Sequence, residues 1–251
     1  MCAKIVQITD LHLFEDPAGE LLGVNTRDSF GAVMADVERR HGDADLLVIS
    51  GDIAQDEAFP TYVALREALG ENWSKRCRLI PGNHDNRAAM RAAFATDLFT
   101  PGVEWLGFAV SVDGWQVVGV DSQLTGEING RVASVQLDWL DSQLAANTST
   151  LMFIHHPPFA IGVPRLDKYG LYDVDAFTNL IGRHSNVRAV CAGHVHQEAH
   201  ARFGATAFYT SPSTCVQFGN GQGPDTSPTG YGYRVVQLNA NNTVETEIYR
   251  V

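Results

Sequence analysis

Short apolar segments that end in a polar cluster recur along this chain, and they constrain the fold more than any other feature of the sequence. Three of them are apolar enough to be buried strands and end at Asp10-Leu11-His12, Gly51-Asp52 and Gly82-Asn83-His84-Asp85. These strands are expected over residues 4–9, 45–50 and 78–80, with helices between them over 28–41 and 57–69. Such alternation is typical of a parallel sheet with right-handed crossovers, in which ligands bind at the carboxyl ends of the strands.

The second half of the chain repeats the pattern with histidine. Apolar strands at 151–154 and 187–192 end at His155-His156-Pro157-Pro158 and Gly193-His194-Val195-His196. A hairpin is predicted from 108–112 and 116–121, because Asp113-Gly114 between them suits a tight turn. Further helices are expected at 87–94, 134–144 and 175–182, and further strands at 206–210, 231–238 and 243–249 around a loop at 219–230. This mixture indicates an α/β protein with two packed sheets flanked by helices.

The composition excludes several classes of protein. No linker, charge run or repeat divides the chain, so we expect a single domain over residues 1–251. A formal net charge of −11 argues against binding to nucleic-acid polymers, which requires clustered Lys and Arg. No apolar run approaches the ~18 residues of a membrane span, and the amino terminus lacks the layout of a signal peptide. The four cysteines form no CxxC pair, which favours reduced thiols in a cytoplasmic protein.

The strand-end clusters combine carboxylate, amide and imidazole groups. The candidates for metal binding among them are Asp10, His12, Asp52, Asn83, His84, His155, His194 and His196. This mixture of oxygen and nitrogen ligands suits Fe, Mn, Zn or Co better than Ca or Mg alone. A single histidine after an apolar strand is more often structural, but a full set in the same position on successive strands points to a metal centre. Because the candidates are too many for one ion, the sequence predicts two divalent ions that share a carboxylate.

The ordered motifs Asp-x-His, Gly-Asp, Gly-Asn-His-Asp, His-x-Pro and Gly-His-x-His resemble those of the calcineurin-like metallophosphoesterase superfamily. Three further segments resemble the bacterial class III cyclic-AMP phosphodiesterases: Leu22-Gly23-Val24-Asn25-Thr26, Ala54-Gln55-Asp56 and Pro212-Ser213-Thr214-Cys215-Val216-Gln217-Phe218. The resemblance implies a four-layer α-β-β-α sandwich of two mixed sheets, the metallo-dependent phosphatase fold.

The resemblance also implies a role for each ligand. Asp10, His12 and His196 would hold one ion, Asn83, His155 and His194 would hold the other, and Asp52 would bridge them. His84 resembles the catalytic histidine that faces the substrate. Asp85 is interpreted either as the residue that orients His84 or as a helix cap. His156 would either support a neighbouring ligand or lie at the surface.

The expected substrate contacts lie outside the metal ligands, except for Asn83, which serves both. With Asn83 and His84, the resemblance suggests Ser213, Thr214 and Phe218 as substrate-binding residues. The alternative for these last three is a polar turn with a buried phenylalanine. The loop at 159–172, with Arg165, Asp167, Lys168 and Tyr169, is a candidate lid. Gln197 and Glu198 are expected either to orient the histidine ligands or to lie exposed at a strand end.

The predicted function is hydrolysis of 3′,5′-cyclic AMP to 5′-AMP by in-line attack of a hydroxide that bridges the two ions. The alternative is a broader phosphodiesterase acting on glycerophosphodiesters, 2′,3′-cyclic nucleotides or aryl phosphodiesters, with weak activity on cyclic AMP. A non-catalytic scaffold would be expected to lack ligands, and the sequence retains all of them. A homodimer could form through residues 105–115, although a hairpin core would explain Trp105 and Trp115 equally well.

Overall fold

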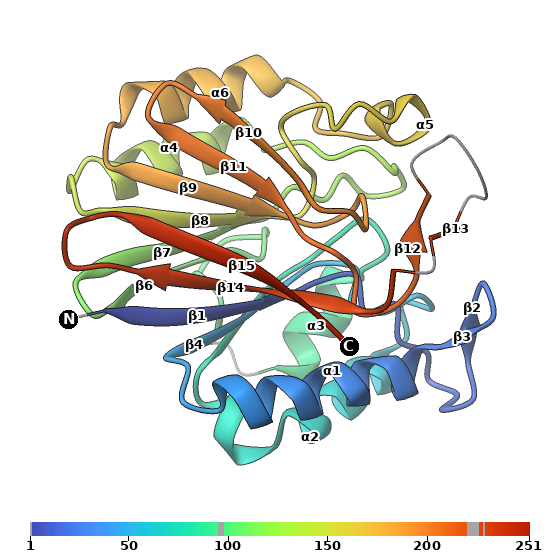
Figure 1. The fold of residues 1–251 in the computed structure, drawn as a ribbon. Helices are drawn as coiled ribbons and strands as arrows, with labels where there is room; N and C mark the ends of the chain where they lie inside the picture. The colour runs from blue at the N-terminus through green and yellow to red at the C-terminus, as the bar shows by residue number, and fades with distance from the viewer. Residues whose placement is uncertain (1, 95–97, 220–225, 228) are drawn as a thin grey trace.

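Two β-sheets lie face to face with helices on their outer sides (Figure 1). The computed structural model describes residues 2–94, 98–219, 226–227 and 229–251. The predicted α/β fold with two mixed sheets is confirmed, and the four layers follow the order helix, sheet, sheet, helix. Most of the predicted loop at 219–230 lies outside the described residues, although Thr226–Ser227 within it form the short strand β13.

Within the described chain, the first sheet has five strands in the order β15-β14-β1-β4-β5. Its strands are β1 (Ala3–Ile8), β4 (Leu46–Ser50), β5 (Cys77–Ile80), β14 (Gly232–Leu238) and β15 (Val244–Arg250). The central β1, β4 and β5 are parallel, whereas β14 and β15 are antiparallel to their neighbours. All five residues of β4 are buried, as expected for a parallel strand covered on both faces.

The second sheet has six strands among the described residues, in the order β10-β11-β9-β8-β7-β6. Its strands are β6 (Phe108–Val112), β7 (Trp115–Val120), β8 (Thr150–Ile154), β9 (Val187–Ala192), β10 (Ala199–Phe203) and β11 (Thr206–Thr210). The predicted hairpin is β6–β7, and its turn residues Asp113 and Gly114 both have positive φ, the conformation that a two-residue type I′ turn requires. The short pairs β2 (Glu20–Leu21) with β3 (Val24–Asn25) and β12 (Gln217–Phe218) with β13 lie outside both sheets.

The described chain has six α-helices, and all but the short α5 cover the two outer faces (Figure 1). They are α1 (Thr26–His41), α2 (Phe59–Ser74), α3 (Arg87–Ala93), α4 (Ser134–Leu144), α5 (Pro164–Asp167) and α6 (Val174–Arg183). The side chain of Asn25 caps α1, which ends in three basic residues that favour its carboxyl terminus. The helix predicted over residues 57–69 is longer in the structure, because α2 continues to Ser74 across a kink at Gly70, whose φ is 59°.

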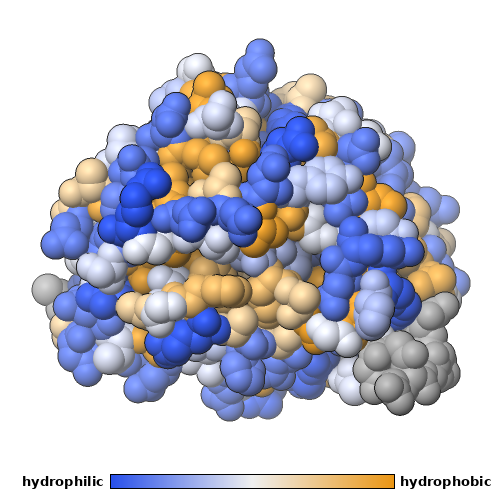
Figure 2. All heavy atoms as spheres, turned by 90° about the horizontal axis from the view of Figure 1, so that it is seen from above, coloured by the Kyte–Doolittle hydropathy of each residue, from blue (hydrophilic) through white to orange (hydrophobic). Residues whose placement is uncertain are grey.

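Three apolar clusters hold the layers together. One joins α1, α2 and α3 to the first sheet, a second joins α4 and α6 to the second sheet, and a third lies between the sheets. Hydrophilic side chains surround smaller apolar areas on the face that carries α6 and β10 (Figure 2). In the described part of the chain no helix combines the length and apolarity needed to cross a bilayer. None of the four cysteines, all of which are among the described residues, forms a disulfide bond.

Candidate metal centre

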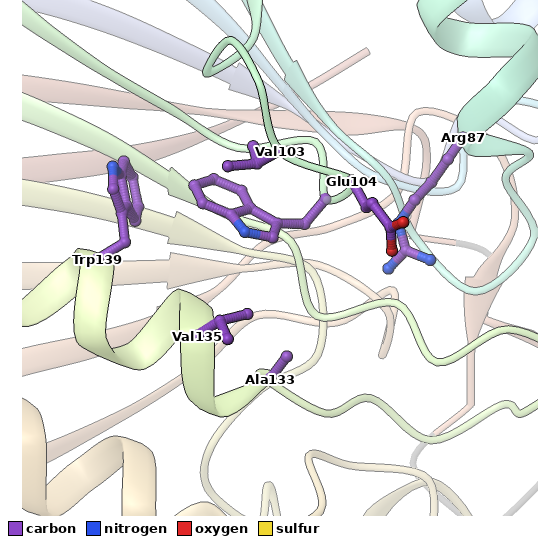
Figure 3. Close-up of a pocket in the computed structure, with 7 residues that line it drawn as sticks. Arg87, Val103, Glu104, Ala133, Val135 and Trp139 are labelled. Carbon is purple, nitrogen blue, oxygen red and sulfur yellow. The ribbon is translucent and has the colours of Figure 1, made fainter.

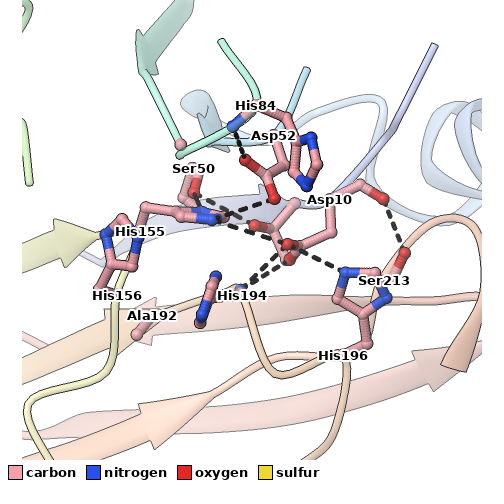
Figure 4. Close-up of polar contacts among 12 residues, drawn as sticks. Asp10, Ser50, Asp52, His84, His155, His156, Ala192, His194, His196 and Ser213 are labelled. Atoms are coloured by element: carbon pink, nitrogen blue, oxygen red, sulfur yellow. Dashed lines mark hydrogen bonds and ion pairs between the residues drawn. The ribbon is translucent and has the colours of Figure 1, made fainter. Parts of the chain in front are cut away.

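The ends of five strands from both sheets meet at one edge of the molecule (Figure 4). The first sheet contributes the residues that follow β1, β4 and β5, and the second contributes those that follow β8 and β9. Among the described residues, four overlapping groups have ligand atoms within 4.8 Å of one another. They are Asp10, His12 and His196; Asp10, Asp52 and His155; His12, Asp52 and His84; and His155, His156 and His194. The sequence motifs therefore converge in space, although they are separated by up to 186 residues, from position 10 to position 196.

The backbone at these strand ends is strained in a common way. Asp10, His12, Asp52, His194 and His196 all have positive φ, between 47° and 69°. Non-glycine residues rarely adopt this conformation, and it costs roughly 1–3 kcal/mol at each position. Strain of this kind persists only where the surrounding structure enforces it, and it concentrates at functional sites.

Hydrogen bonds between the loops enforce this backbone. The N–H of Asp10 donates to the Gly51 carbonyl at 3.0 Å, and the N–H of His12 donates to the Asp52 carbonyl at 2.9 Å. The Asp10 carboxylate accepts the N–H of His194 at 3.0 Å, which connects the first sheet to the second. Gly82 has no side chain because a Cβ there would overlap the Asp52 carboxylate.

His12 and His196 point their Nε2 atoms at each other, at 3.2 Å. Each ring is held through Nδ1, which lies 2.7 Å from Gln55 Oε1 in His12 and 2.6 Å from the Val216 carbonyl in His196. Both partners are hydrogen-bond acceptors, so each ring is held through a hydrogen bond from its Nδ1, and the two Nε2 atoms are the ring nitrogens that face each other. Two nitrogen ligands about 2.1 Å from one ion stand a little over 3 Å apart, so this arrangement fits a shared cation.

A second set of donors lies beside the first. His155 donates from Nδ1 to the Ser50 carbonyl at 2.9 Å, and its buried Nε2 has no hydrogen-bond partner. The buried Oδ1 of Asn83 also has none. The Asp52 Oδ2 atom lies 3.3 Å from His155 Nε2 and 3.8 Å from His12 Nε2, between the two sets. An amide oxygen without a hydrogen bond and an imidazole nitrogen beside a carboxylate are ligands that fit a second cation, and Asp52 is placed to contact both cations.

The electrostatics favour cation binding at this edge. Burial lowers the pKa of His12 and of His194 to about 4, so both rings are neutral and available as ligands at pH 7. Burial also lowers the pKa of His155, but the carboxylates of Asp52 and Asp10 overcome that effect and raise it to about 9. In the metal-free chain, positive charge is therefore favourable between these carboxylates.

The candidate metal ligands Asp10, His12, Asp52, Asn83, His155, His194 and His196 are called the donor set below. His156 takes no part in it. Its Nδ1 lies 2.8 Å from the Ser122 hydroxyl, and its Nε2 lies 3.0 Å from the Ile128 carbonyl. Since both ring nitrogens have protein partners, neither is available to an ion. The side chain is fully buried, so the expectation of a surface position is wrong. Its ring packs against His155 and His194, which agrees with a supporting position.

His84 lines the cavity above the candidate ligands, whereas Asp85 is buried below it. The Asp85 carboxylate accepts the N–H groups of Gly82 at 2.8 Å and Ile53 at 3.1 Å, together with the Tyr62 hydroxyl at 3.0 Å. The structure replaces both interpretations of Asp85. Its carboxylate has no hydrogen bond to His84 among the described contacts, and the cap of α3 is Asn86. Asp85 instead holds the loops that carry Asp52 and His84 together.

Two of the three candidates in the 212–218 segment do not face the cavity. Ser213 and Thr214 are fully buried. The Ser213 hydroxyl donates to the Asp10 carbonyl at 2.6 Å and accepts the N–H of Cys215 at 2.8 Å. Ser213 is thus part of the scaffold through its side chain, which agrees with the polar-turn alternative. Thr214 is held through its backbone N–H, which donates to the Thr9 carbonyl at 3.1 Å, while its hydroxyl has no hydrogen-bond partner. Phe218 does line the cavity, but its ring stacks on His196 at 4.1 Å with an interplanar angle of 12°.

The cavity above the donors has a volume of about 220 Å³ and takes its walls from both sheets and from the 159–172 loop. This loop contains α5 and contributes Arg165, Leu166 and Tyr169 to the wall. The Arg165 guanidinium donates to the Gly219 carbonyl at 3.1 Å and lies 5.5 Å from the centre of the Phe218 ring. The loop therefore covers one side of the cavity, in agreement with the predicted lid position.

The remaining candidates have structural contacts. Asp167 accepts the N–H of Ile161 at 2.7 Å inside the 159–172 loop, and Lys168 lies over the Tyr169 ring. Gln197 donates to the Phe218 and Gly219 carbonyls at 2.9 and 2.8 Å, so it holds that segment and not a histidine. Glu198 is exposed, as in the second alternative.

A larger apolar cavity of about 630 Å³ lies away from the metal centre, between Trp105, Trp139, Val103, Ala133 and Val135 (Figure 3). The two indole rings are 4.6 Å apart between centroids. Trp115 belongs to the core between the sheets, which supports the hairpin-core explanation for that residue. The homodimer stays a prediction.

The sequence predicted no role for Gln55 beyond its place in a family-like segment, but its contacts show that it belongs to the site. It lies between His12 and His84, 2.7 Å and 3.4 Å from their respective Nδ1 atoms. A signal was available in the sequence, because Gln55 follows Asp52 by three residues in the same strand-end loop. The sequence does not show which residues a loop side chain of this kind will contact.

Comparisons with known proteins agree with this geometry. The model of the calcineurin-like phosphoesterase family matches residues 3–198. The chain is 33% identical to the 3′,5′-cyclic adenosine monophosphate phosphodiesterase CpdA of Escherichia coli (strain K12), over 99% of this chain and 90% of that protein. It is 35% identical to a probable cyclic nucleotide phosphodiesterase of Synechococcus, over 100% of this chain and 93% of the relative.

Solved structures with a similar fold include a dimetal phosphatase from Danio rerio, with a TM-score of 0.70 and 16% identity over 97% of this chain and 98% of that one. A purple acid phosphatase from yellow lupin has a TM-score of 0.67 and 11% identity, over 100% of this chain and 52% of that one. At these identities the likeness establishes the fold alone.

Proposed function

The chain belongs to the calcineurin-like phosphoesterase family, and on that premise we propose that it is a two-metal phosphodiesterase that hydrolyses 3′,5′-cyclic AMP to 5′-AMP. The full-length similarity to cyclic-nucleotide phosphodiesterases supports the substrate. The observation that carries the metal-dependent part is the pair of Nε2 atoms of His12 and His196, which face each other at 3.2 Å while an oxygen holds each Nδ1. A cation that both nitrogens bind would account for this arrangement.

The donor set divides into two groups around one carboxylate. Asp10, His12 and His196 would hold one ion. Asn83, His155 and His194 would hold the other, with Asp52 in contact with both. When bound, two divalent ions supply positive charge for the phosphate and lower the pKa of an attacking water toward ~7. With carboxylates only from Asp10 and Asp52, this centre keeps a net positive charge in an acidic protein.

The residues of the chain perform the other tasks. The cavity walls formed by Leu166, Tyr169 and Phe218 restrict water access and orient the nucleoside. His84 faces the departing ribose 3′-oxygen and donates a hydrogen bond to it, because this oxygen is a poor leaving group that otherwise leaves as an alkoxide. The backbone N–H of His84 donates to the Asp52 Oδ1 at 2.9 Å, which fixes the position of this residue relative to the donor set.

A substrate panel on the purified protein, loaded with Mn²⁺, tests the assignment. We expect the highest kcat/KM for 3′,5′-cyclic AMP, with 5′-AMP as the product, compared with 2′,3′-cyclic AMP, a glycerophosphodiester and bis(p-nitrophenyl) phosphate. A nucleotide site must lower the barrier for the matching leaving group. Better turnover of the aryl diester or the glycerophosphodiester would replace this proposal with the broader phosphodiesterase. An Asp52→Ala preparation controls for contaminating activity.

A further inference from the structure

The side chain of Gln55 bridges two histidines that have different tasks in the site. Its Oε1 lies 2.7 Å from Nδ1 of His12, and its Nε2 lies 3.4 Å from Nδ1 of His84. His12 belongs to the donor set, and His84 lines the cavity. Their rings meet edge to face with centroids 5.2 Å apart.

The backbone holds Gln55 in this place. Its N–H donates to the Leu13 carbonyl at 2.8 Å, and the Leu13 N–H donates to the Ile53 carbonyl at 2.9 Å. On the other side, the Asp85 carboxylate accepts the N–H groups of Ile53 and Ala54, each at 3.1 Å. The amide is therefore presented to both histidines from a loop that is fixed at each peptide unit before it.

The two ends of a carboxamide are not equivalent, because the oxygen only accepts and the nitrogen only donates. If Nε2 of His12 is to bind a cation, Nδ1 must carry the hydrogen, so Gln55 must turn its oxygen to His12. Its NH₂ group then faces His84, whose Nδ1 must accept. The proton of a neutral His84 ring is left on Nε2.

We propose that Gln55 is a positioning residue that sets both tautomers at once, exposing the lone pair of His12 to the metal and the Nε2 proton of His84 to the substrate. This inference deepens the proposed function, since it rests on His12 as a ligand and on His84 as the hydrogen-bond donor to the leaving oxygen. As the P–O3′ bond breaks, the oxygen takes the bonding pair, the Nε2–H of His84 donates a hydrogen bond to it, and a water molecule supplies the proton of the new 3′-hydroxyl.

The tautomers can be observed directly by ¹H–¹⁵N NMR of the histidine side chains in the Zn²⁺-loaded protein. We expect the wild-type His84 ring to carry its proton on Nε2 and the His12 ring on Nδ1. In Gln55→Met, His84 becomes a mixture of tautomers, and Zn²⁺ affinity falls about 10–100-fold because His12 loses its acceptor. Gln197→Met, the same change beside His196, is the matched control and leaves the His84 signals unchanged.

The isosteric variant Gln55→Glu separates the hydrogen bond to His12 from the hydrogen bond to His84. It also keeps the proposal testable if Gln55→Met does not fold. A carboxylate oxygen still accepts from His12, so Zn²⁺ binding is retained. The other oxygen cannot donate to His84, and the neutral ring moves its proton to Nδ1. A His84 ring that is protonated on Nδ1 in the wild type, or that is unaffected in both Gln55 variants, would overturn the proposal.

Kinetics provide the second test, with saturating metal and aryl diesters of increasing leaving-group pKa. Gln55→Met should lose about 10–100-fold with the poorest leaving groups and much less with nitrophenyl esters. In a His84→Ala background the same change should cost nothing more, whereas an equal further loss would show that Gln55 acts elsewhere. Failure of cyclic AMP as a substrate would leave the NMR and aryl-ester results intact, so the two proposals fail separately.

Discussion

Two clusters of buried polar groups lie next to each other, and they differ in how many of their polar atoms have a hydrogen-bond partner within the protein. In the strand-end donor set, the Asn83 Oδ1 and His155 Nε2 atoms are buried with no hydrogen-bond partner. In the 211–217 segment, the hydroxyls of Ser211 and Ser213 and the amide of Gln217 have partners within the protein, and only the buried Thr214 hydroxyl is described without one. Polar atoms that are buried without a hydrogen bond and lie together are available to a ligand, whereas those with a partner in the protein hold the scaffold.

The comparison also shows that a missing partner is not sufficient. His41 at the end of α1 is buried, and neither of its ring nitrogens has a hydrogen bond. Its ring packs against Tyr233 and Tyr249, and it belongs to no group of converging ligand atoms among the described residues. A ligand site therefore requires unpaired donors that converge, as those around Asp52 do.

Asp52→Ala should have the largest effect, because it removes the carboxylate that lies between the two halves of the donor set. We expect loss of metal and a fall in kcat/KM on the order of 10³-fold, the equivalent of several kcal/mol of transition-state stabilisation. Metal content by elemental analysis and steady-state kinetics measure both. Glu198→Gln, an exposed carboxylate near the same edge, is the control. Two ions retained in Asp52→Ala would contradict the shared carboxylate.

His84→Ala should separate proton donation from metal binding within the donor-rich cluster. We expect both ions to be retained and turnover of cyclic AMP to fall about 10²–10⁴-fold, the usual contribution of a general acid. The loss should be smaller with nitrophenyl esters, whose leaving groups need no proton. Equal losses with both substrates would remove His84 from this role.

The donor set was predictable from the sequence because each motif follows a buried strand. The end of an apolar run fixes where the chain reaches the edge of the sheet, and positions such as Asp10 and Asp52 need only the strand to be placed correctly. Gly82 marks the close approach of the backbone to Asp52. Neither inference needs knowledge of contacts between distant segments.

The scaffold and supporting residues were not predictable in this way. Ser213 faces the Asp10 carbonyl, 203 residues away in the chain, and a hydroxyl after a strand could equally well face a ligand. Asp85 bonds to the loop at 53–54 because two strand ends pack together. Gln55 contacts two histidines from different loops. Each depends on the packing of segments that local pattern does not specify.

Ser213→Ala tests the scaffold side of the comparison and should have an intermediate effect. Loss of the hydroxyl leaves the Asp10 carbonyl and the Cys215 N–H without their partner, which costs about 1–3 kcal/mol of unfolding free energy. Chemical denaturation measures that loss. The KM for cyclic AMP should stay unchanged in the folded variant. A raised KM with unchanged stability would return Ser213 to the substrate-binding residues.

Substitution of His41 should have the smallest effect, which is on the pH dependence of the unfolding free energy. It tests whether burial alone keeps this histidine neutral in the folded protein. Burial, followed by the charge of Lys4, lowers the pKa of His41 below its ordinary value of 6.5. On acidification the unfolded chain therefore takes up this proton first, so stability is lost as the pH falls below about 6.5 and through the folded pKa. Compared with His41→Phe, the wild type should lose more unfolding free energy between pH 7.5 and pH 5.5, by less than the change expected for Ser213→Ala. Parallel pH profiles for the two proteins, measured by denaturation in the presence of EDTA, would show that His41 is already solvated in the fold.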